Sequence, residues 1–89
     1  MKKDNRYLAV QSILEREKSI KFNELFDIIP RTVVASDMAQ DYRTFAGKVR
    51  NPESFTIAEL ASLSRLFEVD PHKLLELILP HVRLPKKKL

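Results

Sequence analysis

A single glycine, Gly47, is the feature that most restricts what this 89-residue chain can fold into. Tight β-hairpin turns depend on glycine, because their central residues need a positive φ. With one glycine in the whole chain, an antiparallel sheet has almost no turn chemistry to build on. Hydrophobic residues make up 44% of the sequence, which is enough for one modest core. We therefore expect an all-α fold in a single domain, residues 1–85, followed by a short basic tail, 86–89.

Hydrophobic spacing and helix-stop signals divide the chain into five to six short helices. Apolar residues three and four positions apart predict a first helix from Asp4 to about Lys18. A second short segment, 20–29, ends before Pro30, because the residue before a proline avoids the α region. The remaining helices are predicted over residues 32–39, from Asp41 to the Asn51-Pro52 stop, after Thr56 and after Asp70.

Three of these helices begin with capping residues. Asp41 can accept hydrogen bonds from amides that are otherwise unpaired, and its charge suits the positive end of the helix dipole. The segment Thr56-Ile57-Ala58-Glu59 matches the Ser/Thr-x-x-Glu capping box, in which hydroxyl and carboxylate each satisfy a backbone N–H. Asp70 precedes Pro71, which stands at the first helical position, where its missing N–H costs nothing.

Each predicted helix has an apolar face, and the last is apolar over most of its circumference. Either the core surrounds that last helix or another chain covers it, since an exposed patch of this size is a liability for a monomer. The expected inward residues are Tyr7, Leu8, Val10, Ile13 and Leu14; Ile20, Phe22, Leu25, Phe26 and Ile29; Val34, Ala35 and Met38; Phe45 and Val49; and Ile57, Leu60, Ala61, Ser64 and Phe67, flanked by Leu63 and Leu66. The apolar residues of the last helix, which the core or another chain would cover, are Leu74, Leu75, Leu77, Ile78, Leu79 and Val82.

Several classes of protein are excluded by what the sequence lacks. Without cysteine there is no disulfide, no thiolate nucleophile and no Cys-ligated zinc, which fits a reducing cytosol. We expect a soluble cytoplasmic protein, since no stretch approaches the roughly 18 apolar residues of a membrane span and the N-terminus resembles no signal peptide. His72 and Glu76 lie one helical turn apart, but such a pair is more often a surface contact than a metal site. No nucleophile or third ligand accompanies them or His81, so we expect neither an enzyme nor a metal or cofactor.

The net charge of +4 is distributed unevenly along the chain. Five lysines at the two ends account for more than the whole excess, and the remaining body carries 11 basic against 12 acidic residues. Within the body, residues 31–52 carry a net +2 and residues 53–79 a net −3. A polyanion would therefore bind the middle of the chain.

Residues 31–50 resemble the helix-turn-helix pattern of the lambda-repressor-like (Cro/C1, XRE) family of transcriptional regulators. Small Ala35 stands where the first helix approaches the second, Ala39 at the turn, and Phe45 at the buried position of the second helix. Downstream, the stretch KVRNPESFTIAELASLSRLFEVDPHKLLELI is similar to the usual continuation of the family. The resemblance covers roughly residues 20–79.

The sequence departs from the family pattern at several positions. Ala39 replaces the favoured glycine, and the positive φ of such a turn is costly for a residue with a Cβ, by about 1 to 2 kcal/mol. Gln40 and Lys48 replace common aliphatic residues, which suggests a rotated or shortened second helix with Val49 making a core contact. Arg31 and Thr32 stand where the family often has a phosphate-binding glutamine.

The resemblance implies a sequence-specific DNA-binding regulator that places residues 41–50 in the major groove of double-stranded DNA. Arg43 would recognise guanine, Tyr42 would contact a sugar or a thymine methyl, and Asp41 would cap its helix or accept from a cytosine. Gly47 has two interpretations: with Ala46 it lets the backbone approach DNA closely, or the helix ends at Ala46 and the glycine closes it. The expected phosphate contacts are Arg31, Thr32, Thr44, Lys48 and Arg50.

The resemblance also implies a homodimer, because such regulators bind two half-sites about one helical turn apart. Leu75, Leu79 and Val82 are the expected dimer contact, with the first helix as the alternative. A protein-interaction domain that keeps the fold without binding DNA is the alternative function, since fold alone does not determine function.

Overall fold

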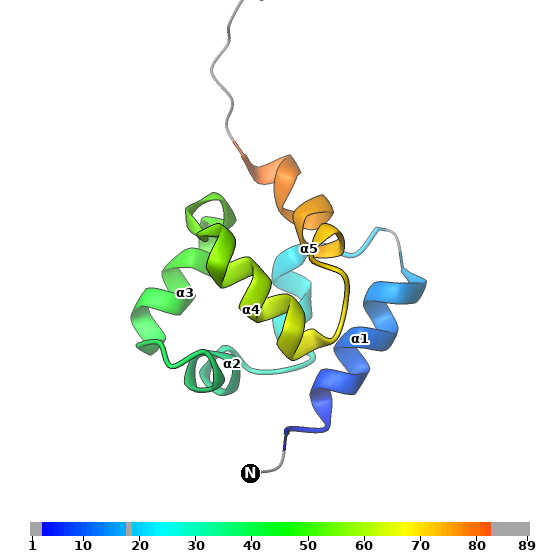
Figure 1. Cartoon of the computed structure of the whole chain (residues 1–89), viewed down its shortest axis with the longest axis horizontal. Helices are drawn as coiled ribbons and strands as arrows, with labels where there is room; N and C mark the ends of the chain where they lie inside the picture. Colours follow the sequence, from blue (N-terminus) through cyan, green and yellow to red (C-terminus); the bar gives the residue numbers. More distant parts are fainter. Residues whose placement is uncertain (1–2, 18, 83–89) are drawn as a thin grey trace, which may run out of the picture.

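The computed structural model describes residues 3–17 and 19–82, and the regular structure of these residues is entirely helical (Figure 1). This confirms the all-α prediction. The predicted tail, 86–89, and the expected helix end at Lys18 lie outside the described residues. The α-helices are α1 Arg6–Arg16, α2 Arg31–Asp37, α3 Tyr42–Arg50, α4 Ile57–Phe67 and α5 Pro71–Ile78, and the 3₁₀ helices are η1 Phe22–Asp27, η2 Pro52–Ser54 and η3 Leu79–His81.

The three predicted caps are all present. The Asp41 carboxylate accepts from the backbone N–H of Thr44 at 3.2 Å. In the capping box, the Glu59 N–H donates to the Thr56 hydroxyl at 3.0 Å and the Thr56 N–H donates to the Glu59 carboxylate at 2.9 Å. Asp70 accepts from the N–H of His72 at 2.9 Å. The starts of α3, α4 and α5 are therefore fixed by side chains next to them in the sequence.

The second predicted helix is a 3₁₀ helix, η1, that is shorter than the 20–29 segment. Phe22 and Leu25 lie three residues apart, a spacing that aligns side chains along a 3₁₀ helix. Both are fully buried. The Glu24 carboxylate accepts from the N–H of Lys21 at 2.7 Å and fixes the start of the segment.

The ends of α2 and α4 share one geometry, in which a residue with a Cβ adopts the left-handed conformation. Ala39 has a φ of 56°, and the next N–H, of Gln40, donates to the carbonyl of Ala35 at 2.9 Å. Glu68 also has a φ of 56°, and the N–H of Val69 donates to the carbonyl of Ser64 at 3.0 Å. Glycine is the usual residue at such helix ends. The expected strain at Ala39 is therefore present, and Glu68 has it as well.

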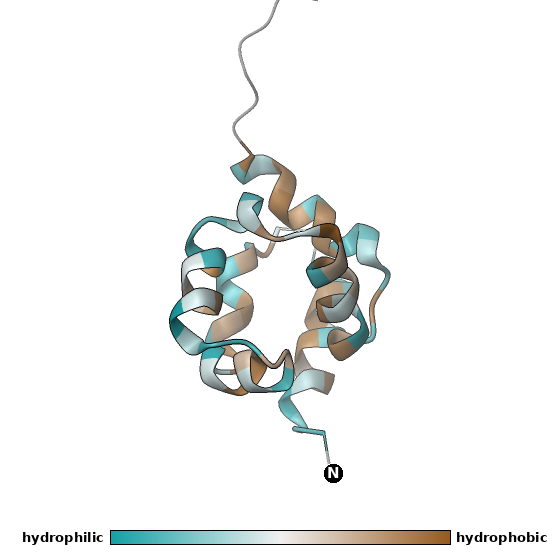
Figure 2. Ribbon diagram, turned by 60° about the vertical axis from the view of Figure 1, so that its left-hand side comes forward, coloured by the Kyte–Doolittle hydropathy of each residue, from teal (hydrophilic) through white to brown (hydrophobic). Residues whose placement is uncertain are grey.

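The helices surround one hydrophobic core, and residues of opposite hydropathy alternate along their ribbons, as expected for amphipathic helices (Figure 2). The core contains a closed ring of four phenylalanines, with neighbouring centroids 5.5 to 5.9 Å apart in edge-on contacts. Phe22 and Phe26 come from η1, Phe45 from α3 and Phe55 from the segment before α4. Because edge-to-face pairs prefer defined orientations, the ring fixes α3 against η1 and the loop that leads to α4.

The inward face of α4 differs from the prediction. Ile57 is 86% exposed and Ala61 is also exposed, whereas Leu63 is buried with Ser64 and Phe67. The helix contacts both α1 and α5, and its buried face is formed by Leu63, Ser64 and Phe67. The hydrophobic periodicity therefore predicted the helix correctly, but the centre of its buried face was predicted at the wrong residues.

The exposure of Leu8 in α1 also corrects the predicted core, and the last helix is covered by the core on one side only. Leu8 is exposed, and the buried residues of α1 are Tyr7, Val10 and Leu14. In the last helix, Leu74 and Ile78 are buried, whereas Leu75 and Leu79 are exposed. None of the helices in residues 3–17 and 19–82 is both long and apolar enough to cross a membrane.

Candidate functional site

Helices α2 and α3 pack against each other and are joined by a turn of residues 38–41, which is the helix-turn-helix arrangement. Val34 and Ala35 of α2 are buried, as are Phe45 and Val49 of α3. Small Ala35 thus occupies the inner surface of α2, as the sequence predicted.

The N-terminal half of α3 presents polar and aromatic side chains to solvent. Tyr42 is 46% exposed, and Arg43 and Thr44 are exposed beside it. Phe45, the next residue, is 0% exposed within the phenylalanine ring. The expected orientation of this helix is therefore confirmed, with its phenylalanine beneath and its arginine outside.

Helix α3 runs through Gly47 to Arg50. The interpretation that the helix ends at Ala46 is therefore wrong. Gly47 does not have a positive φ, and a Cβ placed there would meet a described neighbour only at ordinary contact distance, 3.8 Å from a terminal guanidinium nitrogen of Arg50. Neither the backbone conformation nor the packing around α3 therefore requires a glycine at this position.

Ala46 is only 6% exposed, which corrects the expectation that it lies on the outer face. Helix α3 contacts α2, η1 and η2, so its buried surface is wider than the stripe of Phe45 and Val49 alone. The Ala46 side chain therefore belongs to the packing of α3. It presents no surface to a ligand.

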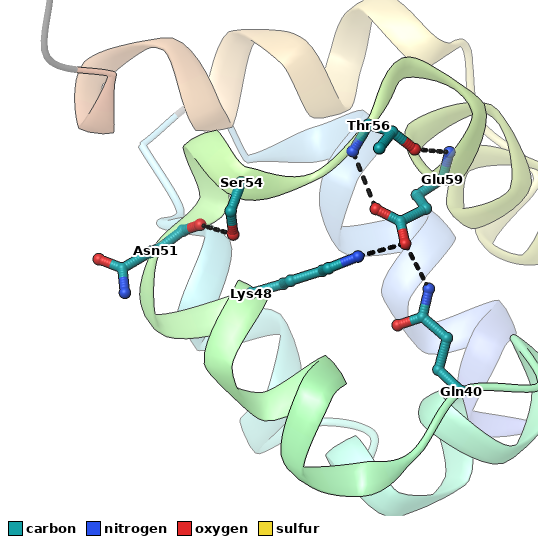
Figure 3. Close-up of polar contacts among 6 residues, drawn as sticks. All are labelled: Gln40, Lys48, Asn51, Ser54, Thr56 and Glu59. Atoms are coloured by element: carbon teal, nitrogen blue, oxygen red, sulfur yellow. Dashed lines mark hydrogen bonds and ion pairs between the residues drawn. The ribbon is translucent and has the colours of Figure 1, made fainter.

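Gln40 and Lys48, the two polar replacements, both contact Glu59 at the start of α4 (Figure 3). The side-chain amide of Gln40 donates to the Glu59 carboxylate at 2.6 Å, and the Lys48 ammonium forms an ion pair with the same oxygen. The other carboxylate oxygen accepts the capping bond from Thr56. Polar contacts therefore occupy the two positions, α3 extends to Arg50, and Val49 makes the expected core contact.

Burial tends to raise the pKa of Glu59, but the bonds from Lys48, the Thr56 backbone and Gln40 outweigh it and lower the pKa. The carboxylate therefore stays charged and holds the ammonium of Lys48, whose side chain is only 22% exposed. The capping-box pattern identifies Glu59 as a capping residue but does not show that it is the centre of this cluster. The sequence does carry one signal of the cluster. Gln40 and Lys48 stand at positions that are usually aliphatic, and Glu59 follows them.

The remaining candidate residues lie at the ends of α2 and α3. Thr32 is exposed in the first turn of α2, next to the half-buried Arg31. Arg50, the last residue of α3, is exposed and lines the same cavity as Arg31. The structure thus brings Arg31 and Arg50 together, keeps Tyr42, Arg43 and Thr44 on the other half of α3, and directs Lys48 to Glu59.

His72, near the start of α5, contacts the residue that caps this helix. The His72 ring lies 2.8 Å from the Asp70 carboxylate that caps α5. Within residues 3–17 and 19–82, no three His, Asp or Glu side chains are grouped closely enough to hold a metal ion.

Comparison of the chain with models of known protein families, with curated proteins and with solved structures gave no match. Functional inference therefore depends on the geometry of α2 and α3 and on the chemistry of the side chains they expose.

Proposed function

We propose that this chain is a sequence-specific DNA-binding regulator that places α3 in the major groove of double-stranded DNA. The observation that carries the proposal is the exposure of Tyr42, Arg43 and Thr44 on a helix whose Phe45 is sealed in the core. The major groove, about 12 Å wide, accepts one α-helix. Gly47 adds support, because a glycine that the fold does not require is explained by a close approach of the backbone to a ligand.

Each exposed residue has a role that follows from its chemistry. The planar guanidinium of Arg43 can donate two parallel bonds to the O6 and N7 of a guanine. Tyr42 contacts a sugar or a thymine methyl, while Thr32 and Thr44 contact phosphates. Asp41 uses its carboxylate for the cap of α3, which reduces its repulsion of phosphates. Lys48 is held by Glu59 and so acts mainly to fix α3 against α4.

A panel of randomised duplexes, selected by the protein and then measured by fluorescence anisotropy, tests the proposal. Arg43→Ala should weaken binding to the selected site by about 1 to 3 kcal/mol and relax the preference at one base pair. Arg65→Ala is the matched control, since Arg65 is an exposed arginine on α4. Equal effects of the two substitutions on every duplex would refute recognition by α3.

Salt dependence separates this function from a protein-interaction domain with the same fold. Several phosphate contacts predict a steep, linear fall of log affinity with log salt concentration. Replacing Lys86, Lys87 and Lys88 with serine removes the contribution of the basic end of the chain. If the remaining protein shows no duplex binding, the interaction-domain interpretation is favoured.

We also propose that two copies associate through the C-terminal segment, where Leu79 is 55% exposed next to Leu75 and the half-buried Val82. Exposed leucines on a helical surface are suited to a self-complementary contact. Sedimentation equilibrium should show a dimer that Leu79→Asp dissociates. Leu8→Asp, on α1, tests the alternative surface, and a wild-type monomer at all concentrations would exclude both.

A further inference from the structure

A cavity of about 500 Å³ lies where η1, α2, α3 and η3 meet. Its polar lining consists of Lys21, Asn23, Arg31, Arg50 and His81. These residues come from the start of η1, the first residue of α2, the last residue of α3 and the end of η3. The volume falls within the range of about 300 to 1,000 Å³ that is typical of small-molecule sites. Val49 and Pro52 supply an apolar part of the wall.

The cavity is lined by cations without a matching carboxylate. Of the described residues that line it, none is acidic, whereas Lys21, Arg31 and Arg50 are basic. None of these three takes part in an ion pair with a carboxylate of residues 3–17 or 19–82. Glu76 lines a neighbouring cavity that shares Lys21 and His81 with this one, and Glu53 lines another that shares Arg50, Pro52 and His81. Like charges held together in this way favour an anionic ligand.

Arg31 provides the second, independent observation. Its Nε is buried and has no hydrogen-bond partner among the described residues. A buried donor without an acceptor is destabilising, so such atoms usually have a ligand, water or protein partner. Because protein atoms enclose this nitrogen, an oxyanion would instead meet the terminal guanidinium nitrogens of Arg31, a residue that is half-buried and lines the cavity.

We propose that this cavity binds a phosphate group. The guanidinium forks of Arg31 and Arg50 match the geometry of phosphate oxygens, and Lys21 adds a point charge. Asn23 and His81 supply further polar groups, and Val49 with Pro52 accommodates the organic part of the ligand. The phosphate belongs either to a free phosphate ester or to a nucleic-acid backbone. The proposal does not depend on the proposed function, because a free ester would bind in the same way to a protein that never contacts DNA.

The position of the cavity is compatible with both sources. Arg50 lies seven residues after Arg43, which corresponds to about 10 Å along the axis of α3. This length is close to the width of the major groove, about 12 Å. If Arg43 enters the groove, the cavity therefore lies near the groove edge, where the phosphates are.

The first arm of the test uses the full-length protein and free phosphate. Inorganic phosphate and adenosine 5′-monophosphate are titrated at constant ionic strength, balanced with chloride, while the arginine Nε–H signals are followed by NMR. We expect a saturable shift of the Arg31 signal. Arg31→Gln and Arg50→Gln should each weaken the response by about tenfold or more, because each removes charge-assisted bonds. The matched control, Arg65→Gln, should leave it unchanged.

The second arm identifies the source of the phosphate. Lys21→Gln and Arg50→Gln are measured against duplex DNA together with Arg65→Gln, and inorganic phosphate is added as a competitor. Competition, with weaker binding to every duplex sequence, assigns the cavity to the DNA backbone. If phosphate binding is saturable but the cavity variants bind duplex DNA as the wild type does, the cavity is assigned to a free phosphate ester. The same assignment holds if phosphate binding is saturable and the protein binds no DNA.

The proposal is overturned if neither arm distinguishes the cavity variants from Arg65→Gln. Thermal unfolding of each variant is measured first. Should Arg31→Gln fail to fold, Lys21→Gln and Arg50→Gln, which change exposed side chains, carry the same comparison in both arms.

Discussion

Gly47→Ala should stabilise the protein and at the same time weaken its binding to DNA. Gly47 lies within α3, three residues before its last residue, Arg50, and does not use a positive φ. The added Cβ would lie 3.8 Å from a guanidinium nitrogen of Arg50, an ordinary contact. Glycine inside a helix is less stable than alanine by about 0.5 to 1 kcal/mol. For a domain of this size, that difference corresponds to a rise in Tm of roughly 2 to 8 °C.

The expected effect on binding has the opposite sign. If the backbone of α3 approaches DNA at Gly47, a methyl group there overpacks the interface, which typically costs about 1 to 3 kcal/mol. The assay pairs differential scanning calorimetry with anisotropy measurements on the same preparations. Ala39→Gly is the control, because it changes stability at the turn without adding atoms to α3.

Two results would contradict this reasoning in different ways. A lower Tm for Gly47→Ala would show that the glycine is needed for the packing of α3. A higher Tm with unchanged duplex affinity would show that the backbone makes no close approach at this position. The second result would remove one support of the proposed function without affecting the structural argument.

Three further substitutions test features of the fold. Ala39→Gly should raise the free energy of unfolding by up to about 1 kcal/mol in urea titrations, because it relieves the left-handed strain; a loss would contradict this. Glu59→Gln should reduce the dependence of stability on pH. The pKa of Glu59 is lowered by folding, so the contribution of its carboxylate is complete above the ordinary value of 4.5 and disappears as the pH falls below it. Identical pH profiles of wild type and variant would show that these bonds do not stabilise the fold. Tyr7→Phe removes the 2.7 Å bond from its hydroxyl to Asp37 and should cost about 1.5 to 3 kcal/mol, while Tyr42→Phe changes an exposed hydroxyl and should cost almost nothing. Equal losses for the two tyrosines would refute a stabilising role for the bond between Tyr7 and Asp37.

The sequence predicted the helix starts well, because the capping groups lie within three residues of the amides they bind. Asp41, Thr56 and Asp70 are all caps in the structure. The inward face of α4 was predicted less well from the sequence. Hydrophobic periodicity locates an apolar stripe on a helix, but it does not show which other elements pack against that helix. The packing of α1 and α5 decided between Ile57 and Leu63.

The candidate site was predictable only in its local part. That Tyr42 and Arg43 face away from Phe45 follows from helical geometry. The ion pair between Lys48 and Glu59 joins two helices across a loop, so it could not be derived from spacing. The cavity that includes Lys21 and Arg50 requires the full tertiary fold, because its residues are distant in the sequence.

The phenylalanine ring couples the outer face of α3 to the cooperativity of the whole domain. Phe45 contacts both Phe26 and Phe55, which belong to segments on opposite sides of α3 in the sequence. Helix α3 therefore cannot detach without opening the core. The hydrogen-bonded amide protons of α3, from Phe45 onward, should exchange with solvent mainly through global unfolding. The residues that face outward on α3 thus stand on a helix that is anchored in the core through Phe45.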